Sequence, residues 1–159
     1  MQPGSPPSLP TSGSFDFGTA GSTVESGYTQ ITPSTLYSTT SGYGWINTAG
    51  LDSRDRGTPD SLREDFVFSS TDHTFVVDLA NGNYQVIVTI GDQNYAHDLI
   101  DVYAEGTLQI NDLSPAAGAF PQITFYVAIA DGQLNLGFHD DGGASPFWMI
   151  NALTIQPQV

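Results

Sequence analysis

The stretch Asn81-Gly82-Asn83-Tyr84-Gln85-Val86-Ile87-Val88-Thr89-Ile90 decides the fold class of this chain. Asn81 and Gly82 both tolerate positive φ angles, so the pair indicates a hairpin turn. After the turn, Tyr84, Val86, Val88 and Ile90 take every second position, which is the period of a strand with one buried face. The stretch therefore predicts an antiparallel strand whose apolar side faces a core.

Similar strand patterns lie on both sides of this stretch. Glu105-Gly106-Thr107 and Asp131-Gly132 supply further turn signals. About ten strands at roughly 10-residue spacing are predicted, and no helical pattern of comparable length is present. The fold class that follows is all-β, a two-sheet antiparallel β-sandwich of the jelly-roll type. Besides 84–90, the predicted strands are 14–18, 28–31, 65–69, 73–79, 99–104, 108–110, 123–129, 134–138 and 148–155.

The chain divides into a short tail and one domain. Residues 1–13 are rich in Pro, Ser and Gly and predict a disordered linker, and residues 14–159 form the sandwich domain. Residues 19–62 are irregular, and we interpret them as ordered loops with one short strand near 28–31. Because 1–13 lacks the apolar segment of a signal peptide, we expect the leader of a secreted protein to lie outside this sequence.

Composition excludes several classes of partner. Three Lys and Arg residues face 17 Asp and Glu residues, which gives a formal net charge of −14. Such a surface repels nucleic-acid phosphates and anionic membranes, so we expect neither as a partner. The chain has no cysteine, which excludes disulfides and thiolate metal sites. Aspartate greatly outnumbers glutamate, and aspartate favours turns and loops over helices.

No catalytic motif stands out in the sequence. There is no Gly-x-Ser-x-Gly nucleophile elbow, no His-Glu-x-x-His zinc motif and no phosphate-binding loop. His97 and His139 each precede an aspartate in a predicted loop, and a His–Asp pair can orient a base. No nucleophile accompanies either pair in the sequence. A small hydrolase using one of these histidines stays an alternative, and His73 is interpreted as structural.

A set of short blocks carries a resemblance to a known family. Taken in order along 14–156, they resemble the galactose-binding-like accessory domain of agarases and of rhamnogalacturonan-acetylesterase-type esterases, a relative of malectin and other jelly-roll carbohydrate-binding modules. The order and spacing of the blocks are more specific than any single block. The blocks are Phe15-Asp16-Phe17-Gly18, Gly42-Tyr43-Gly44-Trp45, Arg54-Asp55-Arg56-Gly57, Asp65-Phe66-Val67, Leu79-Ala80-Asn81-Gly82-Asn83-Tyr84, Gly91-Asp92, Ala96-His97-Asp98 and Ile150-Asn151-Ala152-Leu153.

The resemblance implies a non-catalytic module. Such a domain either binds sugar through its edge loops or packs against the catalytic domain of its parent protein. The matching loops in this chain are 43–45, 92–98 and 139–148. We therefore expect a secreted, extracellular, monomeric carbohydrate-binding module for plant or algal polysaccharide. The main alternative is a structural docking domain without a ligand.

Residue types in these loops suit a sugar. Aromatic rings cover the apolar face of a pyranose, and Asn, His and Arg pair with its hydroxyl groups. Each candidate also has a structural interpretation: the tryptophans can belong to the core, and His97 can pair with Asp98 to brace its loop. The candidate carbohydrate-binding residues are Tyr43, Trp45, Arg54, Asn94, Tyr95, His97 and Trp148.

The arginines cluster between Arg54 and Arg63. A guanidinium can hold a uronate carboxylate with two hydrogen bonds, which makes Arg54 a candidate reader of acidic sugars. Five acidic residues share the segment, so ion pairs that pin the loop are the alternative, and the interpretation we favour.

A structural Ca²⁺ is implied by the resemblance, because related jelly rolls often carry one. Carboxylate and amide oxygens are the ligands that calcium prefers. The candidates are Asp16, Asp140, Asp141 and Asn151. The alternative for Asp140-Asp141-Gly142-Gly143 is a solvated turn.

Overall fold

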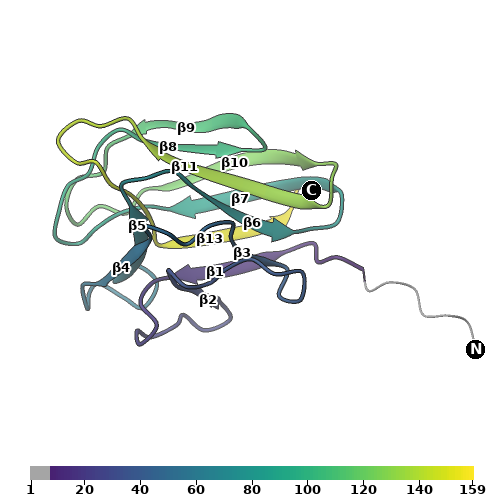
Figure 1. The fold of residues 1–159 in the computed structure, drawn as a ribbon, viewed down its shortest axis with the longest axis horizontal. Helices are drawn as coiled ribbons and strands as arrows, with labels where there is room; N and C mark the ends of the chain where they lie inside the picture. The colour runs from purple at the N-terminus through teal and green to yellow at the C-terminus, as the bar shows by residue number, and fades with distance from the viewer. Residues whose placement is uncertain (1–7) are drawn as a thin grey trace, which may run out of the picture.

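The computed structural model describes residues 8–159 and contains 13 strands. Figure 1 shows them as stacked layers. No residue between 8 and 159 is helical. Within this part of the chain, no helix is long and apolar enough to span a membrane. The strands are β1 (Gly13–Phe17), β2 (Thr29–Ile31), β3 (Tyr43–Trp45), β4 (Asp52–Asp55), β5 (Asp65–Ser69), β6 (His73–Asp78), β7 (Gly82–Thr89), β8 (Ile100–Ala104), β9 (Thr107–Leu113), β10 (Gln122–Ile129), β11 (Gln133–Asp140), β12 (Trp148–Ile150) and β13 (Ala152–Pro157).

The strands form two five-stranded sheets and one three-stranded sheet. The large sheets have the orders β10-β7-β13-β1-β2 and β3-β6-β11-β8-β9, and the small sheet has the order β12-β5-β4. Paired strands are antiparallel except for β1 and β2, which run parallel. The predicted all-β sandwich is therefore confirmed.

The core lies between the two large sheets. In β7, Tyr84, Val86 and Val88 are buried as their period-two spacing predicts. Aromatic rings join the sheets: the centroids of Phe17 in β1 and Trp45 in β3 lie 5.9 Å apart. This close-packed interior fixes the strands whose ends and loops build the site.

The region 19–62 contains more structure than the sequence indicated. It holds β3 and β4 as well as the expected short strand near 28–31. β3 is only three residues long, and β4 (Asp-Ser-Arg-Asp) has no apolar alternation, so neither carries a period-two signal. Their strand conformation comes from pairing with β6 and β5, which lie later in the chain.

The strand predicted over 148–155 is wrong in one respect, because Asn151 divides it. β12 joins the small sheet and β13 joins a large sheet. The Asn151 side chain causes the break by bonding to three backbone groups: it accepts from Gly91 N and donates to Arg63 O and Asp65 O. One continuous apolar run therefore changes sheets at a buried amide.

The predicted tail over 1–13 lies partly outside the described residues. Residues 8–12 are exposed, and β1 begins at Gly13. Pro10 O accepts a hydrogen bond of 2.9 Å from Ala80 N, which places this end of the chain against the turn before β7.

Candidate functional site

A cleft of about 400 Å³ opens beside the small sheet. Three segments form it: β4–β5, the loop between β7 and β8, and the loop between β11 and β12. Aromatic side chains make up much of its lining, as is common for ligand pockets. The lining residues are Arg54, Arg56, Phe66, Phe68, Asp92, Tyr95, Ala96, His97, Ala144, Ser145, Pro146 and Phe147.

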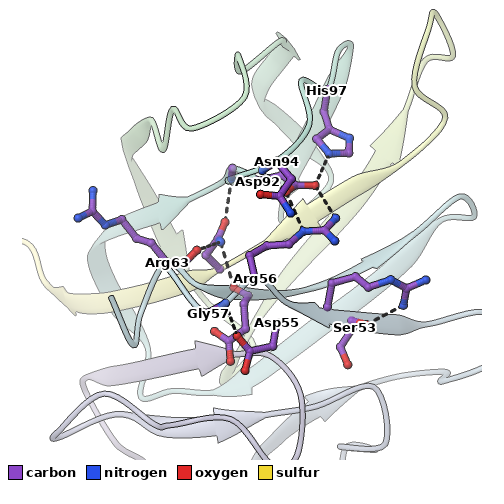
Figure 2. A network of polar contacts seen from close by, with 12 residues as sticks. Ser53, Asp55, Arg56, Gly57, Arg63, Asp92, Asn94 and His97 are labelled. Atoms are coloured by element: carbon purple, nitrogen blue, oxygen red, sulfur yellow. Dashed lines mark hydrogen bonds and ion pairs between the residues drawn. The ribbon is translucent and has the colours of Figure 1, made fainter. Parts of the chain in front are cut away.

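Asp92 is the buried centre of this cleft, with a side chain only 1% exposed. Arg56 donates to it twice, from Nε at 3.0 Å and from Nη2 at 3.1 Å. His97 Nε2 lies 3.0 Å from Oδ2, and Asn94 N donates to Oδ1 at 2.9 Å. Figure 2 shows Arg56 and His97 converging on this carboxylate. Asp92 therefore acts as an internal counter-ion that joins the segment directly after β4 to the β7–β8 loop.

The surroundings of Asp92 keep it ionised. Burial raises the pKa of its carboxyl, but hydrogen bonds from Arg56, His97 and the Asn94 backbone outweigh burial and lower the pKa below its ordinary value. A carboxylate that receives this many donors has little remaining capacity for a ligand. Recognition of a ligand then falls to the other groups in the cleft.

His97 connects the second and third segments. Its Nδ1 lies 2.9 Å from Ser145 Oγ. Asp98 accepts from Ala144 N at 2.9 Å and from Ser145 N at 3.1 Å. The two loops that sequence analysis proposed, 92–98 and 139–148, are therefore held together at one edge of the cleft.

Aromatic rings and guanidinium groups form the rest of the lining. Arg54 Cζ lies 4.9 Å from the centroid of Phe68, and Phe68 lies 5.3 Å from Phe147. Arg56 Cζ lies 5.3 Å from the Tyr95 ring, which is 62% exposed. A cation close to a ring face is held there by the ring quadrupole. The cleft thus presents flat apolar surfaces beside fixed positive charge.

Of the predicted sugar-binding residues, Arg54, Tyr95 and His97 line this cleft. Asn94 is exposed on the same loop, where its backbone N–H bonds to Asp92. The ion-pair interpretation of the arginine segment holds for two of its three arginines. Arg54 pairs with Asp52 and Arg63 with Asp60 inside the segment, whereas Arg56 reaches out of it to Asp92.

The predicted roles of Trp45 and Trp148 as sugar platforms are wrong. Both side chains are 0% exposed. Trp148 stacks on Phe138 at 4.8 Å and donates from Nε1 to Thr71 O at 2.7 Å, and Trp45 packs against Phe17 and Phe75. The core interpretation of the tryptophans is therefore correct.

Tyr43 lies apart from the cleft. It is half-buried on β3 with its ring 5.3 Å from Phe15, and it lines a separate hollow beside Leu9 and Asp78. The loop at 43–45 does not join the other two, and β4–β5 takes its place.

Several cleft residues were missed from the sequence. Phe66 and Phe68 stand two apart in a predicted strand, so a shared face was foreseeable. Their exposure to a cleft was not. Ser145 and Phe147 lie in a loop that carries no pattern. Arg56 stood beside the chosen Arg54, and only the distant contact with Asp92 distinguishes the two.

The contacts of Ser145, His97 and Asp92 resemble the order of a nucleophile, a base and an acid. His97 Nε2 lies 3.0 Å from Asp92 Oδ2, and Nδ1 of the same ring lies 2.9 Å from the Ser145 hydroxyl. Hydrolysis also needs donors for an oxyanion. The N–H groups of Ala144 and Ser145 already donate to Asp98, and Phe147 N donates to Ser145 Oγ itself at 3.4 Å. The arrangement supports a brace between loops better than a catalytic centre.

The predicted calcium ligands do not form one site. Asp16 and Asn151 are close, since Phe17 N donates to Asn151 O, but the Asn151 side chain is fully engaged by backbone groups. Asp140 is the last residue of β11 in the other large sheet, where it pairs with Ile100, and Asp141 follows it in the loop. The set is therefore wrong as a single metal centre.

A different acidic group lies near Asp141. Carboxylate oxygens of Asp101, Asp112 and Asp141 all lie within 4.8 Å of one another, and of the three only Asp101 is buried. Such a group could hold a metal ion. Exposed carboxylates also gather without one, and Asp101 Oδ1 already accepts from Asp112 N.

Comparison with known proteins now identifies the family. The family model described as "Beta-agarase/YXIM esterase-like, galactose-binding domain-like" matches residues 14–156. The chain is 35% identical over 145 residues to Beta-agarase A of Zobellia galactanivorans and 32% identical over 146 residues to the uncharacterized esterase YxiM of Bacillus subtilis. These matches cover 89% of this chain but only 26% and 36% of the two relatives.

Solved structures agree with this assignment. The crystal structure of YxiM from Bacillus subtilis superposes with a TM-score of 0.78 at 29% identity, over 92% of this chain and 40% of that one. The plant receptor-like kinase FER, a malectin-like fold, superposes with a TM-score of 0.65 at 13% identity, over 92% and 42% of the two chains. The second likeness shows the fold alone. The chain belongs to the galactose-binding-like domain family found in beta-agarases and YxiM-like esterases.

Proposed function

We propose that this chain is a non-catalytic carbohydrate-binding module whose cleft holds part of a polysaccharide. The observation that carries the proposal is the cleft itself, in which exposed Tyr95 and half-buried Phe68 and Phe147 stand beside Arg54. Membership of a galactose-binding-like family supports it. The module would keep an attached enzyme close to its substrate by raising the effective concentration. Polysaccharides of this kind lie outside cells, so we propose that the protein is extracellular.

The shape and chemistry of the cleft suit one or two sugar units. A pyranose has an apolar C–H face that can lie on the Tyr95 or Phe68 ring, and its hydroxyl groups can meet Arg54 and Ser145. One such stack with a few hydrogen bonds corresponds to a dissociation constant of about 10 μM to 1 mM. The cleft is preformed by the Asp92 contacts, so little ordering of the loops accompanies binding.

Replacing Tyr95 with alanine tests the proposal. Tyr95 makes no side-chain hydrogen bond among residues 8–159, and its removal should leave the fold intact. We expect binding of the preferred oligosaccharide to weaken about 5- to 30-fold, which corresponds to about 1 to 2 kcal/mol. Isothermal titration calorimetry with neutral agar-derived oligosaccharides and with oligogalacturonates measures the change.

Tyr126→Ala is the matched control. Tyr126 is 56% exposed on β10, outside the cleft, and so resembles Tyr95 in residue type and exposure. The Tyr126→Ala variant should bind the oligosaccharide as tightly as the wild type does. Equal losses in both variants, or no binding by the wild type at millimolar sugar, would contradict the use of this cleft.

Charge in the cleft favours an acidic sugar. Arg54 and Arg56 are two of only three basic Lys or Arg residues in a chain of net charge −14, and both line the cleft. Arg56 is bound to Asp92, whereas Arg54 is half exposed, and its one ion-pair partner among residues 8–159 is the exposed Asp52. Its guanidinium is therefore available to exchange that partner for a uronate carboxylate.

Arg54→Gln tests this preference. We expect the affinity for oligogalacturonate to fall about tenfold, because a charge-assisted hydrogen bond is worth about 1.5 kcal/mol or more. Affinity for a neutral galactan oligosaccharide should change by less than about threefold. The ratio of the two affinities is the measured quantity. An unchanged ratio would contradict the role of Arg54 and leave the cleft in place.

A second candidate function rests on the Ser145–His97–Asp92 contacts, which have the order of a hydrolase triad. The esterase relative makes an acyl ester the substrate to test. Turnover of an acetylated sugar by the purified chain, lost in Ser145→Ala, would support this candidate over binding alone.

A further inference from the structure

A second hollow, of about 350 Å³, lies on the outer face of the sheet that contains β11. β11 is the central strand of that sheet and lies between β6 and β8 (Figure 1). The hollow lies over Gly137, which pairs with Thr74 in β6 and with Tyr103 in β8. Leu136 and Phe138 are buried in the core, so position 137 faces outward. Among the residues that the structure describes, the hollow shares no lining residue with the cleft.

The fold itself does not require a glycine at position 137. Its backbone lies outside the positive-φ region that many other glycines of this chain adopt. A Cβ built at this position would meet one atom within 4 Å in the described part of the chain beyond its sequence neighbours, Tyr103 Cβ at 3.6 Å, which is an ordinary van der Waals contact. Glycine inside a strand weakens the strand and often marks a place where a ligand approaches the backbone. The missing side chain therefore keeps the hollow open.

The walls of the hollow suit a sugar unit. Tyr103 is half-buried, and its pairing partner on β9, Leu108, is 41% exposed. Thr74 presents a hydroxyl group from the opposite strand, and Asp72 presents carboxylate oxygens from the turn before β6. The C–H face of a pyranose can lie on the Tyr103 ring while its hydroxyl groups bond to these oxygens.

Charges around the hollow favour a neutral sugar. His139 is the basic group on its β11 side, and its Nδ1 and Nε2 lie 2.7 Å from Asp72 and 2.9 Å from Asp141. Asp101 pairs with His139 on the neighbouring strand. Three carboxylates thus surround one imidazole, and within residues 8–159 no arginine lines the hollow. The resulting negative field repels a uronate, in contrast to the arginine-lined cleft.

We propose that the hollow over Gly137 is a second carbohydrate subsite, which takes a neutral sugar unit. The proposal rests on the proposed function for its class of ligand, but it uses none of the cleft residues. The chain connects the two sites directly, because β11 ends beside His139 and continues into the loop whose residues 144–147 line the cleft. Two weak sites on one module hold a polymer that reaches both more tightly than either site does alone.

The test is a titration of the isotope-labelled chain with neutral agar-derived and galactan oligosaccharides, followed through the amide NMR signal of each residue. We expect the signals of Thr74, Tyr103 and Gly137 to shift together and to saturate. Oligogalacturonate at the same concentration should shift signals around Tyr95 and leave those three in place. If millimolar neutral sugar moves none of the three signals, the proposal is overturned, and the signals around Tyr95 still report separately on the cleft.

Gly137→Val and Tyr103→Ala locate the subsite. Valine fills the hollow and favours a strand, so the Tm of Gly137→Val should equal or exceed that of the wild type. Tyr103→Ala removes the ring without adding volume. Each variant should weaken neutral-sugar binding at this site about 5- to 10-fold. Full affinity in both folded variants would overturn the proposal.

Gly21→Val is the matched control for the added side chain. Gly21 is exposed in the β1–β2 loop, outside the positive-φ region, and a Cβ there would meet no described atom within 4 Å. This variant should bind neutral sugar as tightly as the wild type does.

Tyr95→Ala separates failure of this subsite from failure of the cleft. The variant should keep the sugar-dependent shift of the Gly137 signal and lose the shifts of the cleft. If Tyr95→Ala also loses the Gly137 shift, the cleft is the one binding site and the proposal is overturned. If the Gly137 signal responds in the wild type and the signals of the cleft do not, the subsite stands and the cleft assignment fails.

Discussion

Replacing Arg56 with alanine is expected to destabilise the protein by about 3 to 5 kcal/mol. The substitution would remove the guanidinium partner of Asp92, whose side chain is 1% exposed, and leave His97 as its remaining side-chain partner. A buried carboxylate that loses its counter-ion is disfavoured far more than the pair itself stabilises the fold. For a chain of this length the Tm should fall by about 6 °C or more, and urea unfolding gives the free energy directly.

Arg63→Ala is the control for this result. Arg63 also pairs with an aspartate, but its side chain is 43% exposed and that of Asp60 is 41% exposed. Exposed pairs contribute about 0 to 1 kcal/mol. Arg56→Lys separates charge from geometry, since lysine keeps the charge but cannot form two parallel bonds, and it should restore only part of the loss. Equal stability of Arg56→Ala and Arg63→Ala would contradict the central role of Asp92.

The dependence on pH should change with this variant. The pKa of Asp92 is lowered in the folded wild type, so its stabilising contribution is present above the ordinary carboxyl pKa and is lost as the pH falls through the folded value. Without Arg56, burial would dominate and raise the pKa. In the variant, Asp92 should therefore destabilise the fold less at acidic pH than at neutral pH. In the wild type, the stabilising contribution of Asp92 is lost over the same change of pH.

Replacing Trp148 with alanine is expected to destabilise the fold by about 3 to 5 kcal/mol. The ring fills the core between Phe138 and His73, and its Nε1–H bonds to Thr71 O. Alanine leaves a large cavity and an unsatisfied carbonyl. Chemical unfolding measures the loss.

Trp148→Phe and Tyr126→Ala are the controls for this loss of stability. Phenylalanine retains most of the ring and should lose less, whereas the exposed Tyr126 should change stability by no more than about 0.5 kcal/mol. Acrylamide should quench neither tryptophan efficiently in the native state. Strong quenching of both would contradict their burial.

The two tryptophans also show why the site was only partly predictable. Trp45 follows Gly44 in a region rich in Gly, Ser and Thr, a context equally suited to an exposed platform and to a short buried strand. Its burial depends on the pairing of Trp45 with Phe75 in β6, 30 residues later. The local sequence pattern does not predict that pairing, because a three-residue strand is too short for a periodic signal.

The arginines illustrate the same point for charge. Arg54 and Arg56 differ little in sequence context, yet one is half exposed and the other is fixed to Asp92. The contact spans 36 residues and brings together segments of different sheets and loops. Sequence analysis selected Arg54, Tyr95 and His97 because residue type is local, and missed Arg56, Phe68 and Ser145 because their role depends on neighbours.

Amino-acid order alone determined the class of this fold. Period-two alternation in segments such as 84–90, with Asn-Gly and Asp-Gly turns, fixes which residues face a core, because side chains alternate along any extended strand. Tertiary structure alone decided which polar groups became buried together, as it did for Arg56 and Asp92 in the cleft. The physical reason is that desolvation and charge pairing act between residues that are distant in the chain. Composition and spacing do not indicate which of these residues come close together in the fold.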